Sequence, residues 1–283
     1  MSQKSDMMIE YNNIKWFLHH GVLLPMVPPD VDIQLNSQDQ TFLHKRTKAR
    51  FIRWTSQFDK QDGEFWYIIK DSFGGIEELS SNTRSKVRRG MKDFIACPAS
   101  FKHIKKKGYH IYANAFQRFS TFEKPMGEAE FHRYFSSLEK SGYYEIWGVW
   151  NQQNNELAGF SENLILGPSC FYETIYFDPS YLKKYSSYVL FFEMNQHYLK
   201  ERDFNYVHDG SRSLSHETNV HSFLIDKFKF RKAFCKLHIS YRCDIGLLAK
   251  TLYPFRNVIY KRDGPVGKRL AVLLRHEDIR RCS

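Results

Sequence analysis

The stretch IYFDPSYLKKYSSYVL, residues 175–190, decides the fold of this chain. Ile175–Phe177 continues an aromatic and β-branched run that predicts a strand. Pro179 then breaks the strand, and Lys183 and Lys184 stand in a short loop. From Ser187 the apolar residues resume with a spacing that predicts a helix. The free N–H groups at the start of such a helix favour an anion beside the loop.

The elements around this stretch predict a meander followed by alternating helices and strands. In chain order we expect strands at Tyr144–Trp150, Leu157–Leu166 and Cys170–Phe177, a helix from about Ser187 to Arg202, a strand at Asn205–Asp209, a polar loop at Gly210–Thr218, a helix at Asn219–Phe228 and a strand at Phe234–Tyr241. The first three strands are separated by turn sequences and should pair in antiparallel fashion.

The outer parts of the chain give weaker patterns. We expect an irregular N-terminal arm over residues 1–64, a core over 65–243, and a C-terminal helix with a basic tail over 244–283. Within the core, the upstream elements are a strand at Phe65–Lys70, an amphipathic helix at Glu77–Ile95, a strand at Tyr109–Ala113 and a helix at Glu128–Lys140.

The composition favours anionic partners. The 283 residues carry a formal net charge of +11, which attracts phosphates, RNA or an acidic membrane surface, although a well-solvated basic surface explains it equally. The five Cys residues are scattered and show no metal-ligand spacing, so we expect a reducing compartment and no metal. Neither a signal peptide nor a membrane-spanning run is visible, which predicts a soluble, cytoplasmic protein.

The stretch around residue 180 resembles the acyl-CoA site of the GNAT acetyltransferases. Pro179, Tyr181 and Leu190 have the spacing of the proline, aromatic and leucine positions of that site, and the predicted order of elements over residues 65–241 also matches that of the family. Leu182, Tyr185 and Ser187 stand where the family has Arg or Gln and two glycines. The resemblance implies an α+β fold with a twisted, mainly antiparallel sheet and helices on both faces.

The same resemblance implies an acyltransferase that moves an acyl group from acetyl-CoA or another acyl-CoA to an amine. The residues implied at the donor phosphates are Lys183, Lys184, Ser186, Ser187 and Tyr188. Because glycine lets a backbone approach phosphate closely, its replacement by Tyr185 costs about 1–2 kcal/mol if a left-handed conformation is needed there. The alternative interpretation is an ordinary strand-to-helix loop with a capping Ser and two exposed lysines.

A second resemblance concerns the basic helix TRSKVRRGMKDF, residues 83–94, which is similar to that of the Fem-type branch of this superfamily. This branch transfers aminoacyl groups from tRNA, and a tRNA donor would not need the missing glycines. A third alternative is a binding protein that kept the fold without catalysis. The acceptor implied by the enzyme readings is an amine on a small molecule or a glycan precursor.

Two glutamates on the predicted meander are candidate general bases. Glu173 and Glu162 occupy strand positions where the GNAT family often has its base. By simple alternation Glu173 shares a face with Phe171, Ile175 and Phe177, so its carboxyl would be half-buried with a raised pKa. An exposed Glu in an ion pair is the alternative.

The segment HDGSRSLSHETN, residues 208–219, is the densest polar cluster in the chain. It follows a strand and precedes a helix, so it should lie at the edge of the sheet where the resemblance places the acceptor. Asp209 and His216 are catalytic candidates, the latter because its pKa lies near neutrality. The candidates for substrate binding are Arg212, Ser211 and Asn219. Turn and cap formation is the alternative role for these residues.

Overall fold

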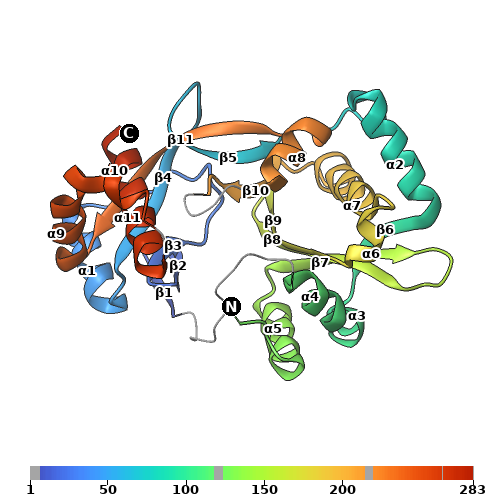
Figure 1. Ribbon diagram of the computed structural model, residues 1–283, viewed down its shortest axis with the longest axis horizontal. Helices are drawn as coiled ribbons and strands as arrows, with labels where there is room; N and C mark the ends of the chain where they lie inside the picture. Colours follow the sequence, from blue (N-terminus) through green and yellow to red (C-terminus); the bar gives the residue numbers. More distant parts are fainter. Residues whose placement is uncertain (1–6, 118–123, 214–218, 263, 283) are drawn as a thin grey trace. The chain divides into compact units, whose positions relative to one another are not determined.

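The computed structural model describes residues 7–117, 124–213, 219–262 and 264–282, which fall into two compact units (Figure 1). The first unit contains Ile68–Gly210 and Val220–Arg231, and the second contains the other described residues. The predicted strand at Phe65–Lys70 is confirmed as β5, and its residues are shared between the two units. No helix in the described ranges combines the length and apolar composition of a membrane span.

The first unit is built on a mainly antiparallel sheet, as predicted. Its strands are β6 (Phe94–Ala99), β7 (Tyr144–Asn151), β8 (Leu157–Leu166), β9 (Ser169–Phe177) and β10 (Tyr206–Ser211). Their order is β10-β9-β8-β7-β6, and only the β9–β10 pair is parallel. The predicted three-stranded meander is therefore confirmed as β7, β8 and β9.

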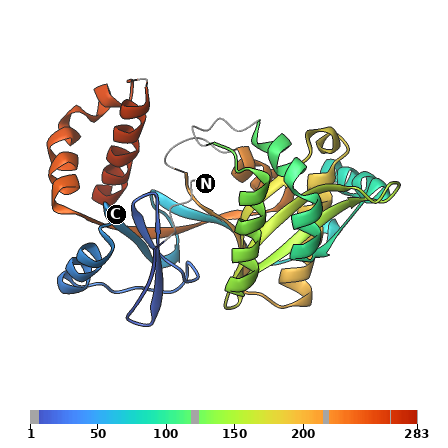
Figure 2. The same cartoon turned by 90° about the horizontal axis from the view of Figure 1, so that it is seen from below.

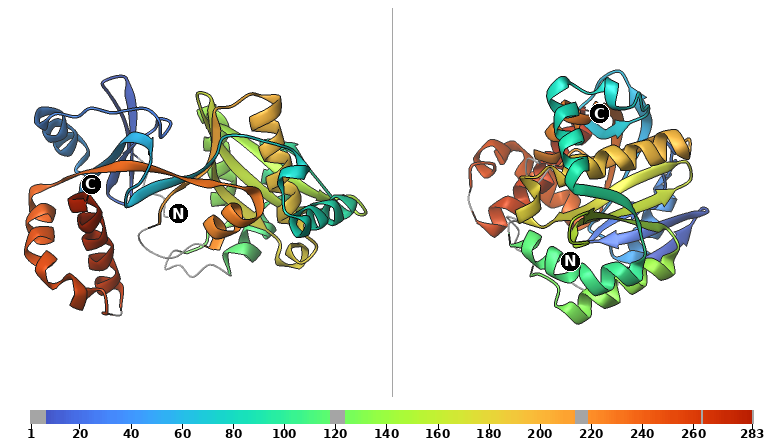
Figure 3. Two further views of the ribbon diagram at one scale, coloured as in Figure 1. Left: turned by 90° about the horizontal axis from the view of Figure 1, so that it is seen from above. Right: turned by 90° about the vertical axis from the view of Figure 1, so that its right-hand side faces the viewer.

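Helices cover both faces of this sheet (Figure 3). They are η1 (Ile76–Glu78), α2 (Ser81–Asp93), α3 (Phe101–Lys107), α4 (Tyr109–Phe116), α5 (Glu128–Ser141), α6 (Pro179–Leu182), α7 (Ser186–Asn195), the π-helical segment η2 (Gln196–Glu201) and α8 (Asn219–Phe228). Phe131 and Phe135 of α5 pack with Phe160 of β8 in the core on one face. On the other face, α7 contacts α2 and packs against α8 through aromatic rings.

Two sequence predictions in this unit are wrong. Tyr109–Ala113 is part of helix α4 rather than a strand, because Ile111 and Ala115, one helical turn apart, are both buried against the α5 core. The helix predicted to reach Ile95 ends at Asp93, and strand β6 follows directly. Pro98 lies within β6, which is possible because β6 is the last strand of the sheet and its outer edge needs no N–H donor.

The irregular conformation expected for residues 1–64 is wrong over most of its length. The second unit contains β1 (Met8–Tyr11), β2 (Ile14–His19), β3 (Val22–Pro25), α1 (Ser37–Thr47), β4 (Phe51–Lys60) and β11 (Arg231–Tyr241), with the strands in the order β1-β2-β3-β4-β11. Trp16, Leu23 and Leu43 are fully buried in its core.

The expected basic tail is also helical. The chain continues after β11 with α9 (Cys243–Leu252), η3 (Tyr253–Phe255), α10 (Arg256–Ile259) and α11 (Pro265–Cys282). Figure 2 shows α9 and α10 following one another alongside α11. Leu274 is buried on α11, and the buried carboxylate of Glu277 accepts hydrogen bonds from Arg280 and Arg281. Glu277 therefore pairs with both arginines and offsets one of their two positive charges.

Candidate functional site

Strands β9 and β10, at one end of the strand order β10-β9-β8-β7-β6, separate along their length. Their parallel pairing joins Ser169–Phe171 to Tyr206–His208 and goes no further. The rest of β9, from Tyr172 to Phe177, has no partner in β10 although it continues to pair with β8. The sequence resemblance implies that the donor binds where these two strands part.

A β-bulge at Glu173 lies next to this separation. Glu162 is opposite Thr174, whereas Asn163 is opposite Tyr172, so Glu173 is the extra residue on β9. The bulge reverses the alternation of the strand. The Tyr172 hydroxyl bonds to Asn195 on α7 (3.0 Å), whereas the Tyr176 ring packs on Tyr112 of α4, on the opposite face. The prediction that Glu173 shares one face of the strand with Phe171, Ile175 and Phe177 is therefore wrong, because the bulge puts Phe171 and Ile175 on opposite faces.

Glu162 is a fully buried carboxyl on β8 beside the bulge. Its Oε2 accepts a hydrogen bond from the Tyr134 hydroxyl (2.7 Å), while its Oε1 has no hydrogen-bond partner among the described residues. Burial raises the pKa of Glu162 to about 8, and the Glu173 carboxylate adds to the rise. Glu162 lies opposite Thr174, the residue after Glu173, so the structure brings the two predicted glutamates close together.

Tyr134 on α5 was missed at the sequence level. Its pKa lies well above the usual value because of burial and the neighbouring carboxyls, so it stays protonated and donates to Glu162 at neutral pH. Tyr134 follows Phe131 by three residues and precedes Leu138 by four, which places it on the buried face of α5. A tyrosine on a buried face needs a partner for its hydroxyl, and this was the signal available in the sequence.

Asp209 occupies a different environment from Glu162. Its carboxylate lies 3.3 Å from Nε2 of His221 on α8, and burial raises its pKa. It also interacts electrostatically with Tyr172, the residue that bonds to α7. Asp209 thus belongs to the α7 and α8 side of the sheet, whereas Glu162 belongs to the α5 side.

The remaining residues of the predicted polar loop do not form a cluster with Glu162 among the described contacts. Arg212 in the second unit bonds to the carbonyl of Glu64 (2.6 Å) and pairs with its carboxylate (3.1 Å). Ser211 ends β10, and Asn219 begins α8 with an exposed side chain. His216 lies outside the described residues.

The loop before α7 keeps the backbone shape of a glycine-containing turn without the glycine. Tyr185 adopts the left-handed conformation, with φ 69° and ψ 26°. Ser186 is buried and its hydroxyl donates to the carbonyl of Tyr181, so it fixes the loop and is not turned outward. Lys183 and Lys184 are exposed.

The basic helix α2 packs directly on this loop. A Cβ added at Gly90 would stand 2.7 Å from Val189 of α7 and 2.9 Å from the Tyr185 carbonyl oxygen, so the two segments are in close contact. The Lys86 amine lies 5.4 Å from the Tyr188 ring centre and the Arg89 guanidinium 5.0 Å from that of Tyr185. Cations of α2 therefore lie at the N-terminal end of α7, against the loop that also carries Lys183 and Lys184.

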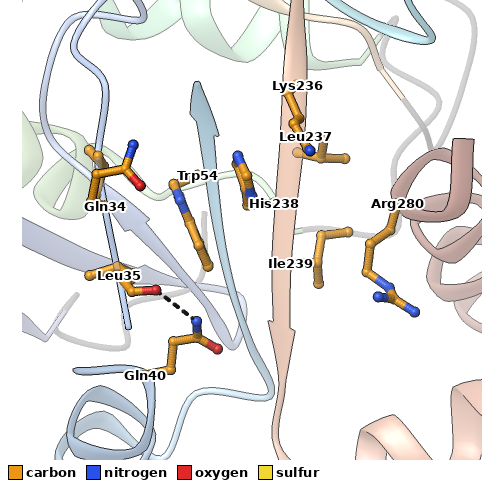
Figure 4. A pocket seen from close by; sticks show the side chains of 10 residues that line it. Gln34, Leu35, Gln40, Trp54, Lys236, Leu237, His238, Ile239 and Arg280 are labelled. Carbon is orange, nitrogen blue, oxygen red and sulfur yellow. Dashed lines mark hydrogen bonds between the residues drawn. The ribbon is translucent and has the colours of Figure 1, made fainter. Parts of the chain in front are cut away.

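The second unit contains a hollow of about 370 Å³ (Figure 4). The Trp54 and His238 rings stack at 5.1 Å in its lining, and Gln40 donates to the Leu35 carbonyl. The Ser56 hydroxyl lies 2.7 Å from Nε2 of His238, and burial lowers the pKa of that histidine. None of the site residues predicted from the sequence lines this hollow.

Solved structures with the same fold match both units of the chain. The C-terminal domain of a putative lysylphosphatidylglycerol synthetase from Agrobacterium fabrum superposes with a TM-score of 0.56 at 11% identity, over 87% of each chain. FemX matches with a TM-score of 0.56 at 8% identity, over 90% of this chain and 88% of its own. L-PGS from Bacillus licheniformis gives a TM-score of 0.51 at 13% identity, over 94% and 88%.

No protein-family model and no curated protein matches the sequence. At these identities the structural matches establish the fold alone. The chain has a GNAT-type fold, and it shares this fold with FemX over 90% of its length.

Proposed function

We propose that this protein is an acyltransferase that moves an acyl group to an amine acceptor, with Glu162 as the general base. The observation that carries the proposal is the state of the Glu162 carboxyl. It is fully buried, it has one oxygen without a partner among the described residues, and its pKa of about 8 suits a base at neutral pH. It also lies beside the bulge where β9 and β10 part.

In the proposed reaction Glu162 accepts one proton from the acceptor amine. As the amine nitrogen bonds to the acyl carbonyl carbon, one N–H proton passes to the ionised carboxylate of Glu162. The bond between the acyl carbon and the donor's sulfur or oxygen then breaks, and the leaving group takes up the proton that Glu162 accepted, which restores the carboxylate. Tyr134 donates to Oε2 and holds the carboxyl so that Oε1 is the oxygen available for the proton.

The donor that we favour is an aminoacyl-tRNA. Tyr185 puts an aromatic side chain where glycine would let a pyrophosphate approach the backbone, which argues against close CoA binding. The cations of α2 lie against the same loop and suit a longer polyanion held by side chains. The two Fem-type resemblances, in the basic helix and in the fold, support this choice.

Acyl-CoA is the second candidate donor, and the backbone of Tyr185 favours it. The left-handed turn and the start of α7 keep the geometry of a phosphate-binding loop, and Ser187 with the two exposed lysines would contact the phosphates. The amine of a small molecule or a glycan precursor remains the proposed acceptor for both donors. Roles for Asp209, Arg212, Ser211, Asn219 and His216, and a cytoplasmic location, remain predictions.

Glu162→Gln tests the catalytic role. Product formation would be followed with acetyl-CoA or an aminoacyl-tRNA as donor and a panel of amines as acceptors. We expect the variant to lose about 10²–10⁴-fold in rate, as removal of a general base usually does. The wild-type rate should rise with pH and level off above a pH of about 8, where Glu162 is ionised. A rate that is unchanged in the variant refutes the role of Glu162.

The double variant Lys86→Gln with Arg89→Gln separates the two donors. If tRNA is the donor, these changes should weaken tRNA binding and reduce the slope of log affinity against log salt by about one for each lost contact. The control is Lys45→Gln with Arg46→Gln on α1, which removes the same charge from exposed positions. Thermal stabilisation by acetyl-CoA with no binding of tRNA at low salt favours the CoA donor. The absence of binding by either ligand favours a protein without catalytic activity.

A further inference from the structure

The C-terminal helices expose large apolar side chains. Leu247 is 65% exposed, Phe255 62% and Val258 59%, and Val266 at the start of α11 is 69% exposed. Ala249 and Ile259 on the same two helices are buried. Helices α9 and α10 contact α11 and bury side chains there, whereas the exposed apolar side chains are not covered by any of the described residues.

These exposed residues lie close together in the chain, on consecutive short helical segments. Leu247 is on α9, Phe255 on η3 and Val258 on α10, and Leu248 on α9 is also exposed. Of the ten large apolar side chains that are exposed among the described residues, five lie between Leu247 and Val266, and we call these five the apolar stripe. Scattered apolar residues on a surface are ordinary, but such a concentration favours an apolar partner.

The same part of the chain is rich in cations. Residues 242–269 contain seven Lys or Arg and two Asp, a formal charge of +5. Arg242 and Arg256 are held by carboxylates at 2.6 Å and 3.3 Å. Four further cations are exposed and form no ion pair among the described residues: Lys250, Lys261, Arg262 and Arg269. The region therefore combines an apolar stripe with uncompensated positive charge.

We propose that α9, α10 and the start of α11 dock this protein on an anionic lipid bilayer as a peripheral protein. Apolar side chains flanked by Lys and Arg are typical of helices that lie in the membrane interface. The apolar stripe would enter the boundary between headgroups and acyl chains, while the cations pair with anionic headgroups. A second copy of this chain would bring the same excess positive charge to the stripe, so charge complementarity favours the lipid.

Co-sedimentation with vesicles tests the proposal on the full chain. Vesicles of phosphatidylcholine alone are compared with an equimolar mixture of phosphatidylcholine and phosphatidylglycerol. We expect binding to the mixed vesicles only, and its loss at high salt. The variant Phe255→Ser with Val258→Ser should weaken the partition coefficient at least about tenfold. Lys261→Gln with Arg262→Gln should weaken it about thirtyfold.

Matched controls come from elsewhere on the chain. Ile95→Ser changes a 53% exposed apolar residue of β6, and Lys102→Gln with Lys106→Gln removes two exposed charges on α3. Neither control should change binding. Equal binding by all variants, or no binding to the mixed vesicles, overturns the proposal. So does sedimentation as a dimer that the Phe255 variant abolishes, because the stripe would then be covered by a second copy.

Discussion

Replacement of Glu162 by Gln should stabilise the protein, and by more as the pH rises. The pKa of Glu162 is raised from 4.5 to about 8 by burial, so the folded protein binds this proton more tightly than the unfolded chain. The free energy of unfolding of the wild type therefore falls as the pH rises from about 4.5 to about 8. Glutamine is neutral at every pH, keeps an oxygen for the Tyr134 hydroxyl, and does not incur this loss.

The two pKa values give the size of the effect. Between about pH 5 and about pH 8, the wild type should lose about 3.5 kcal/mol relative to the Gln variant. Urea unfolding of both proteins at a series of pH values measures this difference, since the other titrating groups are common to both. A difference that stays constant within about 0.5 kcal/mol would show that Glu162 is already ionised in the folded protein, and would refute both the raised pKa and the argument for a base.

Three further changes test the neighbouring contacts. Tyr134→Phe removes a hydrogen bond that lowers the pKa of Glu162, so the midpoint of the pH–rate profile should move to higher pH. An unmoved midpoint would show that the Tyr134 hydroxyl does not affect the pKa of Glu162. Gly90→Ala should destabilise the protein by about 1–3 kcal/mol in urea unfolding, because the new Cβ meets α7, whereas Gly127→Ala, with open space around its Cβ, should change little. Tyr185→Gly should relieve about 1 kcal/mol of backbone strain and increase the thermal stabilisation by acetyl-CoA; a weaker response would show that the ring itself contributes to donor binding.

The core of the fold was predictable because its strands have clear boundaries. Gly167 and Pro168 separate two β-rich runs, and Pro179 ends the next, so the meander and the following helix could be placed from turn chemistry. The N-terminal hairpins were missed although they have a recognisable signal. Asn12 and Asn13 both have positive φ, as do His20 and Gly21, which are the two-residue turns that join twisted strands.

The site was predictable in part. Glu162 and Glu173 follow from their strands, but their proximity depends on the bulge, and no local pattern in the sequence marks an inserted residue. Tyr134 comes from a helix that lies before the meander in the chain, so only tertiary packing brings its hydroxyl to Glu162. The conformation of Tyr185 was not predictable either, because a left-handed tyrosine is stable only when surrounding contacts enforce it.

The bulge at Glu173 has a consequence for the comparison of this chain with distant relatives. A relative with a regular β9 would have one residue fewer between Tyr172 and Tyr176. An alignment without a gap at this point would match core positions on one side of the sheet with positions on the other. A one-residue gap placed at Glu173 would keep the positions that face α7 and those that face α4 in their correct columns. The loop at Lys183 and Lys184 follows this point in the chain, so residue roles can be transferred to it only after the gap has been placed.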